Sequence, residues 1–211
     1  MQDDLDIARM FTRSDGSYVF ARWNRPMAPV VFGVEEQTVA LVRQALTAVA
    51  TLTGQPLAET DPELGANMMW FFLRDWAELL DTPHLDRLIP ELPALVARLQ
   101  EAEANQYRIF RFDPEGGIRA CFVFLRMDTH LAEAPADMLV LGQAVQSVLL
   151  WSDEAFLGAS PLAVVTPGGP AVLRPEIADI VRAAYAAALP PAATDPSHAL
   201  RLQARLPRPN A

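Results

Sequence analysis

The chain of 211 residues has a hydrophobic fraction of 51% and a formal net charge of −9. This length and apolar content indicate a folded domain with a full core rather than a disordered segment. All 17 basic residues are arginines, which excludes P-loop, Schiff-base and Ser-Lys chemistries, because each needs a lysine amine. The acidic balance argues against a nucleic-acid partner.

Two features of the sequence concern its location. The acidic start, Met1-Gln-Asp-Asp, lacks the apolar region of a secretory signal, so no signal peptide is expected in this numbering. The longest uncharged stretch near the middle, residues 138–151, is shorter than the roughly 20 apolar residues of a membrane-spanning helix. No membrane-spanning segment is therefore expected. A presequence removed before Met1 would place the protein in the periplasm or cell envelope, and otherwise the composition fits a cytoplasmic address.

The first half of the chain combines strand and helix patterns. Apolar residues recur at three- and four-residue steps from 35 to 53, which predicts a helix that Gly54 ends. In chain order the other predicted elements are strands at 18–23, 29–32 and 55–60, a central strand at 67–73, a helical turn at 75–80, and a helical stretch at 84–104 that Pro90 and Pro93 divide.

The second half is dominated by a hairpin and a buried helix. The turn signal at 113–117 predicts a β-hairpin over about 107–127. The uncharged apolar stretch predicts a buried central helix at about 137–151, and a further helix is expected at 175–189. Residues 192–211 are expected to form a loosely attached tail.

The order of these elements predicts an α+β fold with a mixed sheet and flanking helices. No stretch is long enough to separate two cores. We therefore expect an N-terminal segment at 1–17, a single α+β domain at 18–191, and the tail at 192–211.

Asp128, His130 and Glu133 lie close together after the predicted hairpin. Their carboxylate and imidazole groups are of the kinds that bind divalent ions or transfer protons, although such residues are also common in loops. The chain has no HExxH motif and no pair of histidines within two helical turns of each other. No metal site and no cofactor are therefore expected.

Gln143 and Gln146 lie one turn apart on one face of the predicted buried helix. A buried amide without hydrogen-bond partners costs about 1–3 kcal/mol. Either these glutamines bond to loop backbone and fix the helix in place, or their face of the helix lines a site.

The cysteine and the other histidines have structural explanations. Cys121, the single cysteine, excludes an internal disulfide and lies in an alternating apolar strand, where a free cysteine usually acts as a small core residue. His84 precedes a predicted helix and is expected to cap it. His198 falls in the tail and is expected to be solvated. No serine lies in a G-x-S-x-G motif.

Several short motifs occur in the order found in a known bacterial family. They are Ala21-Arg-Trp23 followed by Pro26, Ala66-Asn67 before the aromatic strand, the turn at 113–117 before Ile118-Arg-Ala120, Gln146-Ser-Val-Leu-Leu150 before Ser152-Asp153, and a helix at 177–189. Together, over about residues 18–191, they resemble the family called domain of unknown function 2927. The resemblance implies an envelope protein or lipoprotein that is distantly similar to zincin metallopeptidases.

The family pattern includes a metal motif, C-x-H-E-E-x-x-Q, followed by an Asn-Asp pair. Gln146 matches the glutamine and Asp153 the final acid of this pattern. The positions of the Cys, the His and both acids hold Leu139, Leu141, Gly142 and Gln143. A zincin needs two imidazoles to hold the ion and a carboxylate to activate water. The resemblance therefore implies a zincin-like scaffold without its metal site.

The leading hypothesis is a non-catalytic domain that acts by binding or scaffolding in the cell envelope, with an unidentified protein as partner. The alternative is a peptidase-like hydrolase, which requires a cleft where Asp128, His130 or Glu133 meets Gln143 or Gln146 in the open. The binding hypothesis expects those glutamines to be sealed by side chains. In a third hypothesis, the basic, leucine-spaced tail folds on another protein.

Overall fold

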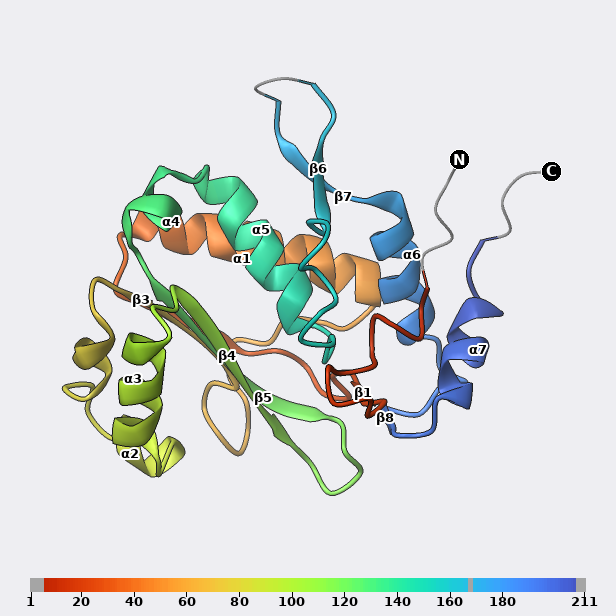
Figure 1. Cartoon of the computed structure of the whole chain (residues 1–211), viewed down its shortest axis with the longest axis horizontal. Coiled ribbons are helices and arrows are strands. Elements are labelled where there is room, and N and C mark those ends of the chain that lie inside the picture. Colours follow the sequence, from red (N-terminus) through yellow and green to blue (C-terminus); the bar gives the residue numbers. More distant parts are fainter. Residues whose placement is uncertain (1–5, 167–168, 208–211) are drawn as a thin grey trace.

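A four-stranded mixed sheet lies at the centre of the computed structural model, which describes residues 6–166 and 169–207 (Figure 1). Across the sheet the strands are β2 (Pro29–Phe32), β3 (Met68–Leu73), β5 (Ile118–Arg126) and β4 (Gln106–Phe112). β3 runs parallel to both of its neighbours, and β4 and β5 form an antiparallel hairpin. The predicted α+β class, with a mixed sheet and a hairpin at about 107–127, is confirmed.

Helices cover both faces of this sheet (Figure 1). The larger core contains side chains of α1 (Glu36–Thr53), α5 (Ala136–Ser147) and α6 (Pro175–Ala184). The smaller core contains side chains of η1 (Trp76–Leu79), α2 (Leu85–Leu88) and α3 (Leu92–Glu101). Along β3, Trp70 and Phe72 belong to the larger core, and Phe71 and Leu73 belong to the smaller one. Burial on both faces explains why this strand is apolar throughout rather than alternating.

The long helix α1 ends where the sequence pattern predicts. Val42, Leu46 and Val49 are buried along one side of it, at the predicted three- and four-residue steps. Gly54 follows in the left-handed region at φ 67°. Glycine adopts this conformation without steric cost, so it ends the helix.

The buried helix α5 ends earlier than predicted, because side chains from other elements bind the carbonyl groups at its C-terminal end. The indole Nε1 of Trp23 donates a hydrogen bond to the Ser147 carbonyl at 2.8 Å. The Tyr185 hydroxyl donates one to the Val148 carbonyl at 2.6 Å. Carbonyl groups at a helix end have no partner within the helix, and these two side chains provide one.

Two features of the connecting segments differ from the prediction. The prediction of a strand at 55–60 is wrong, because this segment forms only an isolated bridge between Leu57 and Met27. A hairpin of β6 (Leu162–Val164) and β7 (Ala171–Leu173) was not predicted and projects from the domain (Figure 1). Residues 167–168, between its strands, lie outside the described ranges.

His84 precedes α2 but does not cap it, which corrects the prediction. Its side chain makes no capping hydrogen bond, and its backbone lies in the left-handed region at φ 62°. A capping side chain reaches the first N–H groups of a helix from an extended backbone, which this residue lacks.

The segment from 192 to 207 is docked on the domain, in contrast to the loosely attached tail expected at 192–211. β8 (Ala192–Ala193) pairs antiparallel with β1 (Phe20–Ala21) near the start of the chain. Beyond it, α7 (Ser197–Gln203) buries three side chains: His198, Ala199 and Leu202. The segment 208–211, which includes Arg208, and the segment 1–5 of the expected N-terminal region lie outside the described ranges.

His198 is 3% exposed and therefore not solvated as predicted. Its Nδ1 lies 2.9 Å from the Tyr18 hydroxyl, and its ring centroid lies 4.2 Å from that of Phe20. Burial lowers the pKa of His198, and the charges of Arg201 and Arg205 lower it further. The histidine is therefore a neutral part of the core that joins α7 to the N-terminal strand.

Replacing Leu202 with alanine should lower the free energy of unfolding by about 2–3 kcal/mol, because it leaves a cavity under α7. Leu202 is fully buried, whereas Leu200 on the same helix is 67% exposed. The same substitution at Leu200 should change stability by less than about 0.5 kcal/mol. Urea unfolding followed by circular dichroism measures both variants. Equal effects would contradict the docking of α7.

Candidate functional site

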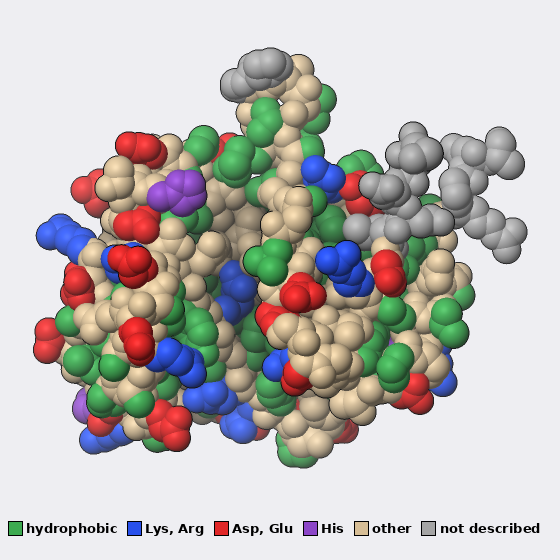
Figure 2. Space-filling model, in the orientation of Figure 1, with side chains coloured by type: hydrophobic (Ala, Val, Ile, Leu, Met, Phe, Trp, Pro, Cys, Tyr) green, Lys and Arg blue, Asp and Glu red, His purple; other side chains and the backbone are tan. Residues whose placement is uncertain are grey.

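A cleft of about 630 Å³ lies along β4, beside the C-terminal end of α5. Figure 2 shows this face of the molecule hollowed between the two elements, with basic side chains in the hollow. We call it the β4–α5 cleft. Its polar lining comes from the N-terminal segment, β4, α5 and the loop that follows α5: Arg13, Gln106, Arg108, Gln146, Ser152 and Asp153.

Arg108 is the central polar residue of this cleft. It pairs with Val123 of β5, so its side chain lies on the face of the sheet that α5 covers. One terminal nitrogen of its guanidinium donates a hydrogen bond to Oε1 of Gln143, and Nε2 of Gln143 donates one to Oε1 of Gln106 at 2.7 Å. Two neutral amides therefore hold the guanidinium in place.

The charge of Arg108 is not balanced within the described ranges. None of the ion pairs found there includes it. Its Nε is buried and has no hydrogen-bond partner among the described residues. Burial lowers the pKa of Arg108, but an arginine stays protonated at neutral pH. The Arg108 side chain is half-buried and lines the cleft, so its charge is only partly solvated, and a bound anion would stabilise it.

The second basic residue of the cleft is Arg13, an exposed side chain of the N-terminal segment. It is likewise absent from the ion pairs of the described chain. The nearby carboxylate of Asp153 accepts hydrogen bonds from both the backbone N–H and the hydroxyl of Ser14. These bonds lower the pKa of Asp153. The carboxylate therefore fixes the N-terminal segment against the loop.

Aromatic side chains form the apolar wall of the cleft. Trp151 and Phe156 meet edge to face with ring centroids 5.1 Å apart, and Phe110 and Phe112 extend from β4. Phe112 is 42% exposed. The cleft thus combines an apolar wall with an unpaired cation, a combination that suits binding of an amphipathic ligand.

The glutamines predicted on the buried helix reach this cleft in different ways. Gln143 is buried and sealed by Arg108 and Gln106, while Gln146 is half-buried and lines the cleft. The partners of Gln143 are side chains of β4 rather than the loop backbone that the sequence suggested.

The structure keeps the other predicted candidates away from the cleft. Asp128 caps α4 (Thr129–Glu133) by accepting a hydrogen bond from the Leu131 N–H at 2.9 Å, and this bond lowers its pKa. His130 and Glu133 are exposed on the same short helix. None of the three lines the β4–α5 cleft.

The donor set of a zincin does not fit this site. Within the described ranges, no group of three or more His, Cys, Asp or Glu side chains is placed to hold a metal ion. On α5, Leu139, Leu141 and Gly142 offer no ligand, and the amide of Gln143 is bonded to β4. The side chains at these positions of α5 therefore do not match the needs of a zinc ion.

Cys121 lies beneath Arg108 and is fully buried. Burial raises the pKa of its thiol to about 12, although the Arg108 charge and a hydrogen bond with Ser147 oppose this.

Because the thiolate is the reactive species, native Cys121 should react with dithionitrobenzoate at least about a hundredfold more slowly than a free thiol. The urea-unfolded protein provides the control. Rapid stoichiometric labelling of the native protein would contradict this expectation.

Arg108 was not identified as a site residue from the sequence, although the alternation of side chains along its strand could have indicated it. In the strand Gln106–Phe112, side chains alternate between faces, so Arg108 shares a face with Phe110. A charge on the face of a strand that also carries a large apolar side chain is a candidate binding group. Arg13 and Phe156 line the cleft because distant segments of the chain come together there, and the local sequence around them does not indicate this.

Comparisons of the chain with family models, with curated proteins and with solved structures give no match. Among the helices of the described residues, none combines the length and the apolar character that crossing a membrane requires.

Proposed function

We propose that this protein is a non-catalytic binding domain that holds an anionic group of its partner in the β4–α5 cleft. The observation that carries the proposal is the Arg108 guanidinium, which lines the cleft without a carboxylate partner in the described chain. Arginine presents several N–H donors in a fixed plane, and carboxylates and phosphates match this geometry. Arg13 adds a second positive charge at the same cleft, where it also interacts with the carboxylate of Asp153.

Binding has more support than hydrolysis. A hydrolase needs a base or nucleophile beside the bound substrate, and Asp128, His130 and Glu133 lie outside the cleft lining. Among the described residues that line the cleft, the one carboxylate is that of Asp153, and it is hydrogen-bonded to Ser14. The buried amide of Gln143 positions Arg108, which is a binding role.

The resemblance to domain of unknown function 2927 supports two further parts of the proposal. The first is a location in the bacterial cell envelope, where the domain would bind or scaffold other components. The second is a zincin-like scaffold that has kept its buried helix and lost the metal ligands at Leu139, Leu141 and Gly142.

Titration of the ¹⁵N-labelled protein with acetate, and separately with inorganic phosphate, tests the anion site. The Nε–H signal of Arg108 should shift and saturate, because an anion bound in the cleft changes the surroundings of its guanidinium. The response should be lost in Arg108→Met and retained in Arg43→Met, which removes an exposed arginine of α1 outside the cleft. No saturable shift, or equal responses in both variants, would contradict the proposal.

A further inference from the structure

β4 is an edge strand with an unpaired side. Among the described strands, β5 is its only neighbour in the sheet. The N–H of Arg126 donates to the Asn105 carbonyl at 2.8 Å, so in this antiparallel pair Tyr107 and Ile109 also direct their backbone groups toward β5. By alternation, the backbone N–H and C=O groups of Gln106, Arg108 and Phe110 point away from β5, along the open edge of the sheet. No other described strand pairs with this edge.

A second cleft opens on the opposite face of the same strand. It has a volume of about 380 Å³ and lies between β4 and the segment formed by α2, α3 and their connection. We call it the β4–α3 cleft. Ile89 and Leu95 provide apolar lining, and Tyr107 and Ile109 of β4 line both clefts. The two clefts therefore flank one open strand edge.

This arrangement matches the geometry of strand addition. A peptide that pairs with a sheet edge gains main-chain hydrogen bonds, and its successive side chains point to opposite faces. Side chains of such a peptide would enter the β4–α5 cleft and the β4–α3 cleft in alternation. The main-chain bonds provide affinity, and the two clefts provide specificity.

The charge along this edge indicates the kind of peptide. Arg98 and Arg111 line the β4–α3 cleft and form no ion pair in the described chain, as holds for Arg13 and Arg108 in the β4–α5 cleft. Arg98 instead donates to the Tyr107 hydroxyl at 2.8 Å. The acidic residues in these linings are Glu91 and Asp153. A protein of net charge −9 thus presents an excess of positive charge along one strand edge.

We infer that the open edge of β4 binds an extended acidic segment of another protein as an added strand, with alternate side chains in the two clefts. This inference rests on the proposed anion-binding function. Charge favours such a partner over a second copy of this chain. An antiparallel pairing of two β4 edges centred on Arg108 would place the Arg108 side chains of both copies opposite each other on one face, and like charges directly opposite across a strand pair are destabilising.

The probe for this inference is the fluorescein-labelled peptide acetyl-Thr-Glu-Val-Glu-Val-Glu-Thr-amide, whose binding to the full chain is followed by anisotropy. A peptide with lysine in place of each glutamate, and one N-methylated at alternate amides, should both bind at least about tenfold more weakly. Arg111→Met, which changes an exposed side chain of the β4–α3 cleft, should also weaken binding about tenfold, whereas Arg43→Met should not.

Amide hydrogen exchange gives the decisive second measurement. The outward N–H groups of Gln106, Arg108 and Phe110 should exchange rapidly in the free protein and become protected by the peptide. Equal binding of the N-methylated peptide would overturn strand addition, while a persistent acetate or phosphate response at Arg108 would leave the proposed function intact. A peptide-free dimer with these amides already protected would overturn the inference in favour of a second copy.

Discussion

Replacing Trp23 with alanine is expected to lower the free energy of unfolding by about 3–5 kcal/mol, at the upper end of what a single core truncation costs. The Trp23 side chain is fully buried, and its indole Nε1 donates to the Ser147 carbonyl at the end of α5 at 2.8 Å. Its backbone bridges Ile118 at the start of β5. The substitution therefore removes apolar contacts, leaves a cavity, and leaves the buried Ser147 carbonyl without this hydrogen bond.

Two further variants separate these contributions in urea unfolding. Trp23→Phe keeps most of the apolar volume and loses the indole hydrogen bond, so it should cost about 1–3 kcal/mol, the penalty of the unpaired Ser147 carbonyl. Leu157→Ala changes a side chain that is 81% exposed and should alter stability by less than about 0.5 kcal/mol. If Trp23→Ala were no more costly than Leu157→Ala, the assigned packing of α5 against the N-terminal segment would be wrong.

Replacing Asn67 with alanine is expected to cost about 3–5 kcal/mol, since it leaves several buried polar groups unpaired. Oδ1 of Asn67 accepts a hydrogen bond from the Ala28 N–H at 2.8 Å. Its Nδ2 donates to the Pro26 carbonyl and to Oδ2 of Asp61, each at 2.9 Å. One side chain thus joins the starts of β2 and β3 to the loop between α1 and β3. Asn24→Ala, which removes an exposed amide bonded to Asp113, is the matched control.

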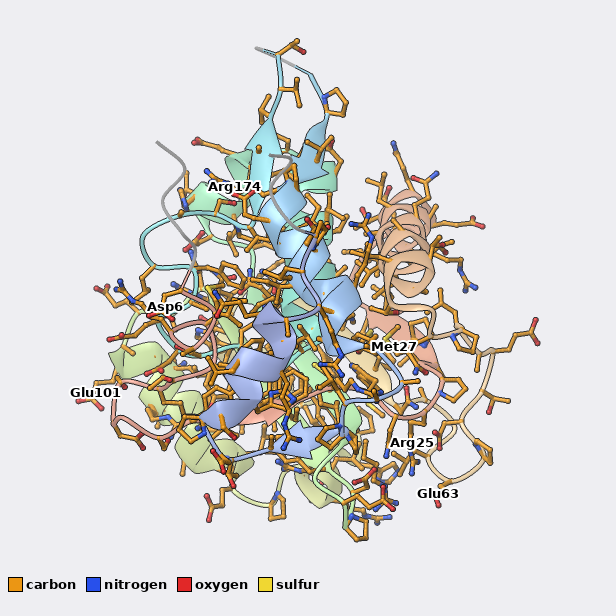
Figure 3. All side chains as sticks on the ribbon, turned by 90° about the vertical axis from the view of Figure 1, so that its right-hand side faces the viewer. Asp6, Arg25, Met27, Glu63, Glu101 and Arg174 are labelled. Carbon is orange, nitrogen blue, oxygen red and sulfur yellow. The ribbon has the colours of Figure 1, made fainter. Side chains whose placement is uncertain are left out.

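The pH dependence of the Asn67→Ala effect gives a second check. Burial alone would raise the pKa of Asp61, but the N–H groups of Leu64 and Glu63 and the Asn67 amide outweigh it, so the pKa is lowered. Arg25 also contributes, and it lies 3.6 Å from Asp61 and 3.1 Å from Glu63, toward which it points in Figure 3. Because the pKa of Asp61 is lower in the folded protein than in the unfolded chain, its ionised carboxylate stabilises the fold at pH values above the unfolded pKa.

This contribution is lost as the pH falls through the folded pKa of Asp61. Without the Asn67 amide, that pKa should move back toward its ordinary value. The stability difference between the wild-type protein and Asn67→Ala should therefore shrink on acidification below the ordinary aspartate range. A difference that stayed constant from neutral pH to strongly acidic pH would contradict the coupling between Asn67 and Asp61.

The elements that were predicted correctly depend on local patterns. The spacing of apolar residues in α1, the glycine that ends it and the turn signal between β4 and β5 act over short stretches of chain. Propensity and turn chemistry therefore determine them. The early end of α5 was not predictable in this way, because it depends on Trp23 and Tyr185, which lie far from it in the sequence.

In the candidate site too, some features follow from the local sequence and others depend on contacts between distant parts of the chain. Proximity in the sequence grouped Asp128, His130 and Glu133, yet the structure uses Asp128 as a helix cap and leaves the other two exposed. Gln143 was correctly identified as a buried amide that needs partners, but its partners are on β4. Which strand packs over α5 is a property of the tertiary fold, so Arg108 enters the site only once the sheet is assembled.

The pairing of β1 with β8 has a consequence for how the chain is made. Phe20 and Ala21 have their strand partners at Ala193 and Ala192, and the ring of Phe20 packs on His198. The ribosome synthesises Phe20 and Ala21 long before Ala192 and Ala193, so β1 cannot pair with β8 until most of the chain has been synthesised. Contacts so distant in sequence form slowly. The β1–β8 pairing and the packing of α7 on Phe20 are therefore expected to form late in folding, after residues 192–203 have left the ribosome.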